Sequence, residues 1–151
     1  MGFLDSLFGK KKKITLEEGH AINQAHVAAN PVPASNENAR MRQASSALTG
    51  KRFQEAIDLY KALANDFPAQ KGTYLSQVGA AYYFLGDYHQ AIDYYVQARD
   101  HGMTAFMIDD NIWEACEAIH SQTRDASIAN RYLELCPGGS HTKAAKKMLG
   151  N

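Results

Sequence analysis

Residues 72–103 read GTYLSQVGAAYYFLGDYHQAIDYYVQARDHGM, and this stretch decides the fold class. Its apolar and small residues recur with the 3.6-residue period of amphipathic helices, on both sides of one interruption. Gly86 and Asp87 form that interruption, and a glycine followed by an aspartate is typical of a turn between helices. The stretch therefore predicts two antiparallel helices joined by a short turn.

Small residues stand where the two helices of this hairpin face each other. Gly79 lies on the first predicted helix, and Ala91 and Ala98 lie on the second. Helices that pack at the short end of the 8–10 Å range need small residues at the crossing, with large side chains filling the flanks. Tyr82 and Tyr95 are placed to fill them, so the pattern predicts a closely packed hairpin.

This pattern resembles the tetratricopeptide repeat, a helix-turn-helix unit of about 34 residues. Leu75 and Met103 replace the tryptophan and the proline of the family pattern. The residues at the family's spacing are Val78, Gly79, Tyr82, Gly86, Asp87, Tyr88, Ala91, Tyr95 and Ala98.

Two further units resemble the same repeat. The upstream unit has its turn glycine, Gly50, one residue early, and matches at Ala44, Ala47, Phe53, Ala56, Tyr60, Leu63 and Pro68. The downstream unit, residues 106–137, has Trp113 at a small-residue position, so its packing is expected to differ. Its other matching residues are Ile112, Cys116, Ala126, Ala129, Tyr132, Leu133 and Pro137.

The resemblance implies an all-α fold over residues 37–151, an α-solenoid of antiparallel helix pairs that forms a superhelix. Residues 140–151, SHTKAAKKMLGN, are expected to form a capping helix with Ser140 as its N-cap. Upstream, Thr15 and Glu18 have the spacing of a capping box and predict a helix over residues 16–29. Two prolines in residues 30–36 then predict a linker, so residues 1–36 form a separate N-terminal part.

Proteins of this family are generally non-catalytic adaptors that bind a peptide or helix of a partner in a concave groove. The first helix of each repeat lines that groove, which here runs from apolar to acidic. Such a groove favours a peptide with apolar anchors followed by lysine or arginine. The groove residues implied by the register are Met41, Ser45 and Leu48, then Thr73, Ser76, Ala80, Tyr83 and Phe84, then Asp110, Glu114 and Glu117.

The chain opens with MGFLDSLFGKKKK, an apolar stretch followed by lysines. On a helix, four apolar side chains share one side, which resembles a small interfacial anchor for an anionic membrane. Three interpretations stay open: a solvated tail, a weak membrane contact, and a ligand for the acidic groove of the same or a neighbouring chain. A self-associating or membrane-surface scaffold is therefore the alternative function. The residues concerned are Phe3, Leu4, Leu7, Phe8, Lys10, Lys11, Lys12 and Lys13.

Composition excludes several other classes. The 16 basic residues balance the 16 acidic ones, which removes the overall electrostatic argument for a nucleic-acid partner. Two cysteines make no disulfide framework and favour a reducing, cytoplasmic location. Cys116 and His120 stand four residues apart, but no second ligand pair follows and Cys116 occupies a core position. We expect no catalytic site, no metal and no cofactor.

Overall fold

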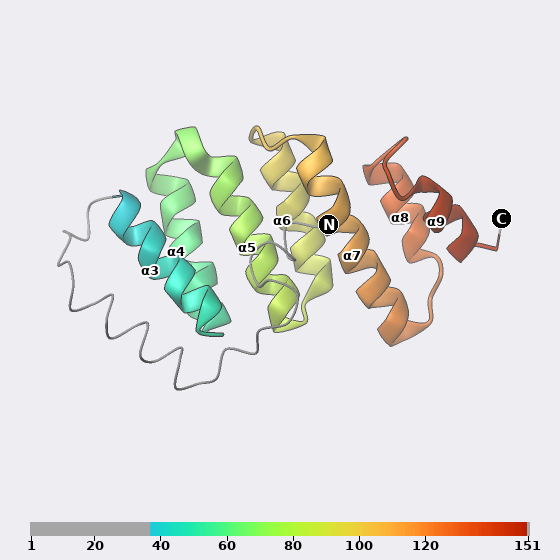
Figure 1. Ribbon diagram of the computed structural model, residues 1–151, viewed down its shortest axis with the longest axis horizontal. Coiled ribbons are helices and arrows are strands. Elements are labelled where there is room, and N and C mark those ends of the chain that lie inside the picture. The colour runs from blue at the N-terminus through green and yellow to red at the C-terminus, as the bar shows by residue number, and fades with distance from the viewer. Residues whose placement is uncertain (1–36, 151) are drawn as a thin grey trace.

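The computed structural model describes residues 37–150, and these residues form an all-helical unit (Figure 1). No strand occurs among them, so the all-α prediction is confirmed for this part of the chain. The predictions for residues 1–36, including the helix over 16–29 and the apolar-basic segment, lie outside the described residues. The elements are α3 (Glu37–Thr49), α4 (Phe53–Asp66), the 3-10 turn η1 (Pro68–Gln70), α5 (Lys71–Leu85), α6 (Tyr88–Asp100), α7 (Ala105–Thr123), α8 (Ile128–Leu135) and α9 (Thr142–Met148).

The helices pack in chain order. The most extensive contacts join α3 with α4, α4 with α5, α5 with α6, and α6 with α7. Figure 1 shows the same succession along the long axis of the molecule, from α3 at one end to α9 at the other. Each helix therefore buries its apolar side mainly against its neighbours in sequence.

The hairpin of α5 and α6 has the turn that the sequence predicts. Gly86 ends α5 in the left-handed conformation, with φ of 90°. The carboxylate of Asp87 accepts a hydrogen bond from the backbone N–H of Gln90 and caps α6. Glycine fits this position because the left-handed region costs it nothing, whereas a Cβ would be strained there.

The close approach predicted between α5 and α6 is also confirmed. A Cβ added at Gly79 would lie 2.6 Å from Cε1 of Tyr95 and 3.2 Å from the carbonyl oxygen of Ala91. Ala91 and Ala98 are fully buried. The structure adds a second close approach that the sequence does not predict: a Cβ at Gly72 would lie 2.5 Å from the carbonyl oxygen of His101. The hairpin is thus tight at both of these points.

In the turn between α3 and α4, the residue in the unfavourable backbone conformation is the one after the glycine. Lys51 adopts the left-handed conformation, with φ of 60°, while Gly50 does not. Because the glycine comes one residue early, a lysine takes the sterically unfavourable position of the turn. The early position of Gly50 therefore makes this turn differ from the α5–α6 turn, where a glycine takes the left-handed conformation.

The C-terminal elements follow the predicted helices with one correction. Helices α7 and α8 cover the third unit, and Trp113 is 5% exposed against the rings of Tyr132 and His141. Ser140 is not the N-cap of α9, because that helix begins at Thr142 after His141. The N–H of Ser140 is instead fixed by an acceptor on α7, which moves the start of the helix downstream.

The core is continuous through the described residues, and it includes Cys116. Burial raises the pKa of the Cys116 thiol to about 12, so the sulfur is a protonated core atom rather than a nucleophile. Within residues 37–150, no helix combines the length and the apolar character needed to cross a membrane. The largest fully buried side chains are Tyr95, Tyr132, Leu48, Ile57, Leu63, Ile92, Ile108 and Ile112.

Candidate functional site

One side of α7 changes from apolar to acidic along its length. Met107, Asp110, Glu114 and Glu117 recur at intervals of three and four residues, which places them on one face of the helix. All four side chains are at least partly exposed, and Met107 is 45% exposed. This stripe therefore offers an apolar contact at the start of α7 and carboxylates further along.

The start of helix α5 lies beside the start of this stripe. The hydroxyl of Thr73 lies 4.0 Å from the sulfur of Met103, just before α7, which puts the two helix beginnings side by side. Further along, burial raises the pKa of Tyr95 on α6, and the charges of Glu114 on α7 and Tyr83 on α5 add to this rise. We call the surface formed by Thr73, Gln77 and Tyr83 of α5 and by Met107, Asp110, Glu114 and Glu117 of α7 the α5–α7 face.

Two polar atoms at this face are buried without a hydrogen-bond partner among the described residues. They are the hydroxyl oxygen of Tyr95 and Oε1 of Gln77. Burial, together with the nearby Glu114 and Tyr83, raises the pKa of Tyr95 well above its ordinary value, so its hydroxyl keeps its proton and can donate it in a hydrogen bond. Both atoms are closed off from solvent, so they belong to the packing beneath the face and not to its contact surface.

The sequence-based groove prediction is wrong at three residues. Leu48, Ser76 and Ala80 are 0%, 1% and 0% exposed, so they belong to the interior and not to a binding surface. The hydroxyl of Ser76 donates to the carbonyl oxygen of Thr73, which satisfies it within its own helix. These small or apolar side chains are covered because neighbouring helices pack closely around them.

The remaining predicted groove residues divide into two groups. Thr73, Tyr83, Asp110, Glu114 and Glu117 come together on the α5–α7 face. Met41 and Ser45 lie on α3, and Figure 1 shows α5 between α3 and α7. Phe84 stacks on Phe53 with ring centroids 5.9 Å apart, so it serves packing. Met41 is 40% exposed on α3, and Ser45 is half-buried there.

A hydrogen-bonded network fixes the C-terminal segment to α7. Asp109 accepts a bond of 2.5 Å from the hydroxyl of Tyr132 and one of 2.7 Å from the N–H of Ser140. The hydroxyl of Tyr132 accepts in turn from the N–H of His141, and Nε2 of His141 lies 2.7 Å from Oδ1 of Asp110. We call these residues, Asp109, Asp110, Tyr132, Ser140 and His141, the C-terminal clasp.

Three members of the clasp have the residue types of a metal site. The ligand atoms of Asp109, Asp110 and His141 lie within 4.8 Å of one another. Both oxygens of Asp109 are already hydrogen-bonded to Tyr132 and Ser140, and Asp110 is paired with His141. The arrangement is accounted for by its role in holding the C-terminal segment.

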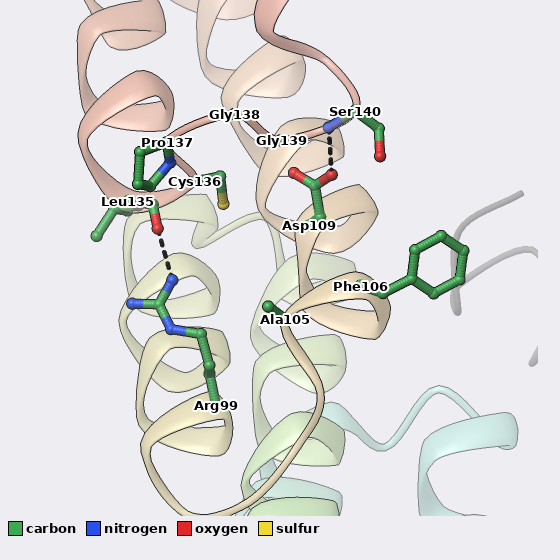
Figure 2. A pocket seen from close by; sticks show the side chains of 10 residues that line it. All are labelled: Arg99, Ala105, Phe106, Asp109, Leu135, Cys136, Pro137, Gly138, Gly139 and Ser140. Atoms are coloured by element: carbon green, nitrogen blue, oxygen red, sulfur yellow. Dashed lines mark hydrogen bonds between the residues drawn. The ribbon is translucent and has the colours of Figure 1, made fainter.

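A cavity of about 390 Å³ lies beside the clasp (Figure 2). Its polar groups are bonded within the chain: Arg99 donates to the carbonyl oxygen of Leu135 at 2.6 Å, and Asp109 accepts from Ser140. The ring of Phe106, which is 78% exposed, points away from the cavity. The two charged groups that line the cavity, Arg99 and Asp109, are therefore both engaged within the chain.

The clasp should make stability depend on pH in acid. Burial raises the pKa of Asp109, but the hydrogen bonds from Tyr132 and Ser140 and the nearby His141 together bring it below the ordinary 3.8. A lowered pKa stabilises the folded state above the unfolded value, and this contribution is lost as pH falls through the folded value. We expect Asp109→Asn to lower the free energy of unfolding by about 1 kcal/mol at neutral pH and to flatten its decline in acid.

The measurement is urea unfolding at several pH values from neutral to strongly acidic. The control is Asp58→Asn, which makes the same change at an exposed position on α4. If both variants decline in acid as steeply as the wild-type protein, Asp109 does not stabilise the fold through its charge.

Several residues of the site escape sequence reasoning. The sequence does contain a signal for Met107, because this residue precedes Asp110 by three positions on the same stripe. The unpaired hydroxyl of Tyr95 and the pairing of Asp110 with His141 have none, since both depend on residues distant in sequence. No protein-family model, curated protein or solved structure matches this chain, so its function has to be argued from this geometry.

Proposed function

We propose that this protein is a non-catalytic adaptor whose α5–α7 face binds a peptide segment of a partner protein. The segment would carry an apolar residue followed by lysine or arginine. The observation that carries the proposal is a partly exposed surface of α7 that runs from Met107 to the carboxylates of Asp110, Glu114 and Glu117.

The arrangement of helices supports a tetratricopeptide-like solenoid as the framework of this function. Consecutive helices pack in chain order, and Gly79 and Ala91 mark the close approach that such a repeat needs. In a solenoid of this kind, the first helices of successive pairs share one surface. In this interpretation α5 and α7 are such first helices, which makes their common face a natural place for an extended ligand.

The chemistry of the face determines the order in which apolar and basic residues should occur in the ligand. Met107 is a flexible apolar side chain that adapts to different hydrophobic partners. The carboxylates of Glu114 and Glu117, beside that of Asp110 which already contacts His141, attract basic residues, which raises the encounter rate and rejects acidic segments.

A catalytic role has less support. The Cys116 thiol is buried and protonated, and burial also raises the pKa of Cys136 to about 11. For the location we propose the cytoplasm, as two unpaired thiols favour a reducing compartment. Contact of residues 1–13 with an anionic membrane surface is the weaker alternative, since the apolar part of that segment is short.

Charge reversal at two positions tests the adaptor proposal. We expect Glu114→Lys with Glu117→Lys to weaken peptide binding at least tenfold, because the face then repels the basic part of the ligand. The probes are labelled synthetic peptides in which two apolar residues precede four lysines, at several spacings, titrated by fluorescence anisotropy against the full chain.

The matched control is Asp58→Lys with Glu134→Lys, which makes the same change in net charge at exposed positions on α4 and α8. It should leave the affinity within twofold of wild type. Equal binding by both double variants, at equal helical content, would rule out the α5–α7 face as the peptide site.

A further inference from the structure

We propose that residues 2–13 of the same chain occupy the α5–α7 face and compete with an external partner. This inference rests on the proposed function, because it assigns an internal ligand to the same face. The segment, GFLDSLFGKKKK, supplies apolar side chains and then four lysines, which is the order that the face requires.

The match between segment and face is one of both polarity and charge. The start of α7 carries the exposed side chains of Phe106 and Met107, at 78% and 45% exposure. The carboxylates of Asp110, Glu114 and Glu117 follow on the same helix. If the apolar residues of the segment contact the start of α7 and the segment runs in the same direction as the helix, its lysines lie opposite the carboxylates. If the segment runs in the reverse direction, the lysines lie away from the carboxylates.

The connection is long enough for docking within one chain. Residues 14–36 separate the segment from the first described helix, and 23 extended residues span up to about 75–80 Å. With the helix predicted over residues 16–29, which would be about 21 Å long, the remaining nine residues still extend the reach to about 50 Å. Helix α7, with 19 residues, is about 28 Å long, so its whole face is within range.

Tethering makes even a weak internal ligand effective. A connection of 23 residues corresponds to a local concentration on the order of 1 mM. A segment that binds with a dissociation constant of tens of micromolar would then occupy the face most of the time. An external peptide must displace it, and this reduces its apparent affinity by about ten- to a hundredfold.

The test uses a labelled peptide of residues 1–13, titrated against the full chain in three forms. Wild type should bind it weakly, because its own segment occupies the face. Phe3→Asp with Leu7→Asp disables the internal segment and should raise the affinity at least tenfold. Adding Glu114→Lys and Glu117→Lys to that variant should abolish the binding.

The matched control is Ile14→Asp with Leu16→Asp, which makes the same kind of change just beyond the segment and should bind like wild type. Two outcomes overturn the inference. One is that wild type and the Phe3/Leu7 variant bind the labelled peptide with equal affinity, while the binding of other apolar-basic peptides still depends on Glu114 and Glu117. The adaptor proposal would then hold without the internal ligand. The other is binding of the labelled peptide to phosphatidylserine vesicles but not to the protein, which assigns the segment to membranes.

Failure of the proposed function itself gives a different result. In that case the apolar-basic peptides either do not bind the Phe3/Leu7 variant, or bind it equally well after Glu114→Lys and Glu117→Lys are added. If the affinity of wild-type protein for the labelled peptide changes with protein concentration, the segment docks on a second copy of the chain. This result would also count against docking within one chain.

Discussion

Trp113→Ala should lower the free energy of unfolding by about 3–5 kcal/mol, because it removes the chain's one tryptophan from the core. The indole is 5% exposed on α7, with the ring of Tyr132 at 5.1 Å in an edge-on arrangement. The ring of His141 stacks in parallel with the indole at 5.5 Å and also contacts the ring of Tyr132. Removing the indole therefore empties the space between α7, α8 and the segment that leads to α9.

Urea unfolding followed by circular dichroism measures this loss. The matched control is Phe106→Ala, which removes an aromatic ring from the same helix at 78% exposure and should change stability by less than about 0.5 kcal/mol. Similar losses in the two variants would mean that Trp113 does not join the C-terminal helices to α7.

Ala91→Leu is the second substitution with a large expected effect, about 1–3 kcal/mol of lost stability. Ala91 is fully buried, and its carbonyl oxygen lies only 3.2 Å from the Cβ position of Gly79 on α5. The two helix backbones are close together at this point, so three additional carbon atoms force either the helices apart or the leucine into a strained rotamer.

The denaturant midpoint of this variant should fall while the slope of the transition stays unchanged. Ala144→Leu on α9 is the control, because the same enlargement at an exposed position meets no neighbouring helix. An unchanged midpoint for Ala91→Leu would contradict the close crossing of α5 and α6.

The features that the sequence predicts correctly are those fixed by local chemistry. Gly86 and Asp87 define a turn by their own conformational preferences, and Gly79 and Ala91 are small because the facing helix of the hairpin leaves no room for more. The all-α class follows from the helical period alone. Each of these signals lies within one helix pair, where the spacing of residues determines the contacts.

The errors concern exposure and long-range pairing. The repeat register places Leu48, Ser76 and Ala80 on the groove, but whether a residue on that register faces solvent depends on how far apart the helices sit. The pairing of Asp110 with His141 joins residues 31 positions apart, and no local pattern marks it. Sequence alone locates the acidic helix and misses the buried hydroxyl of Tyr95 beneath it.

Amide chemical-shift mapping of the full chain carrying Phe3→Asp and Leu7→Asp tests most directly whether the α5–α7 face binds apolar-basic peptides. The ligand is a synthetic peptide with two apolar residues before four lysines. The largest shifts should fall on Thr73 and Gln77 of α5 and on Met107, Asp110, Glu114 and Glu117 of α7. Shifts concentrated on α4, on α8 or around the cavity at Leu135–Ser140, with α7 unchanged, would contradict this assignment of the binding face.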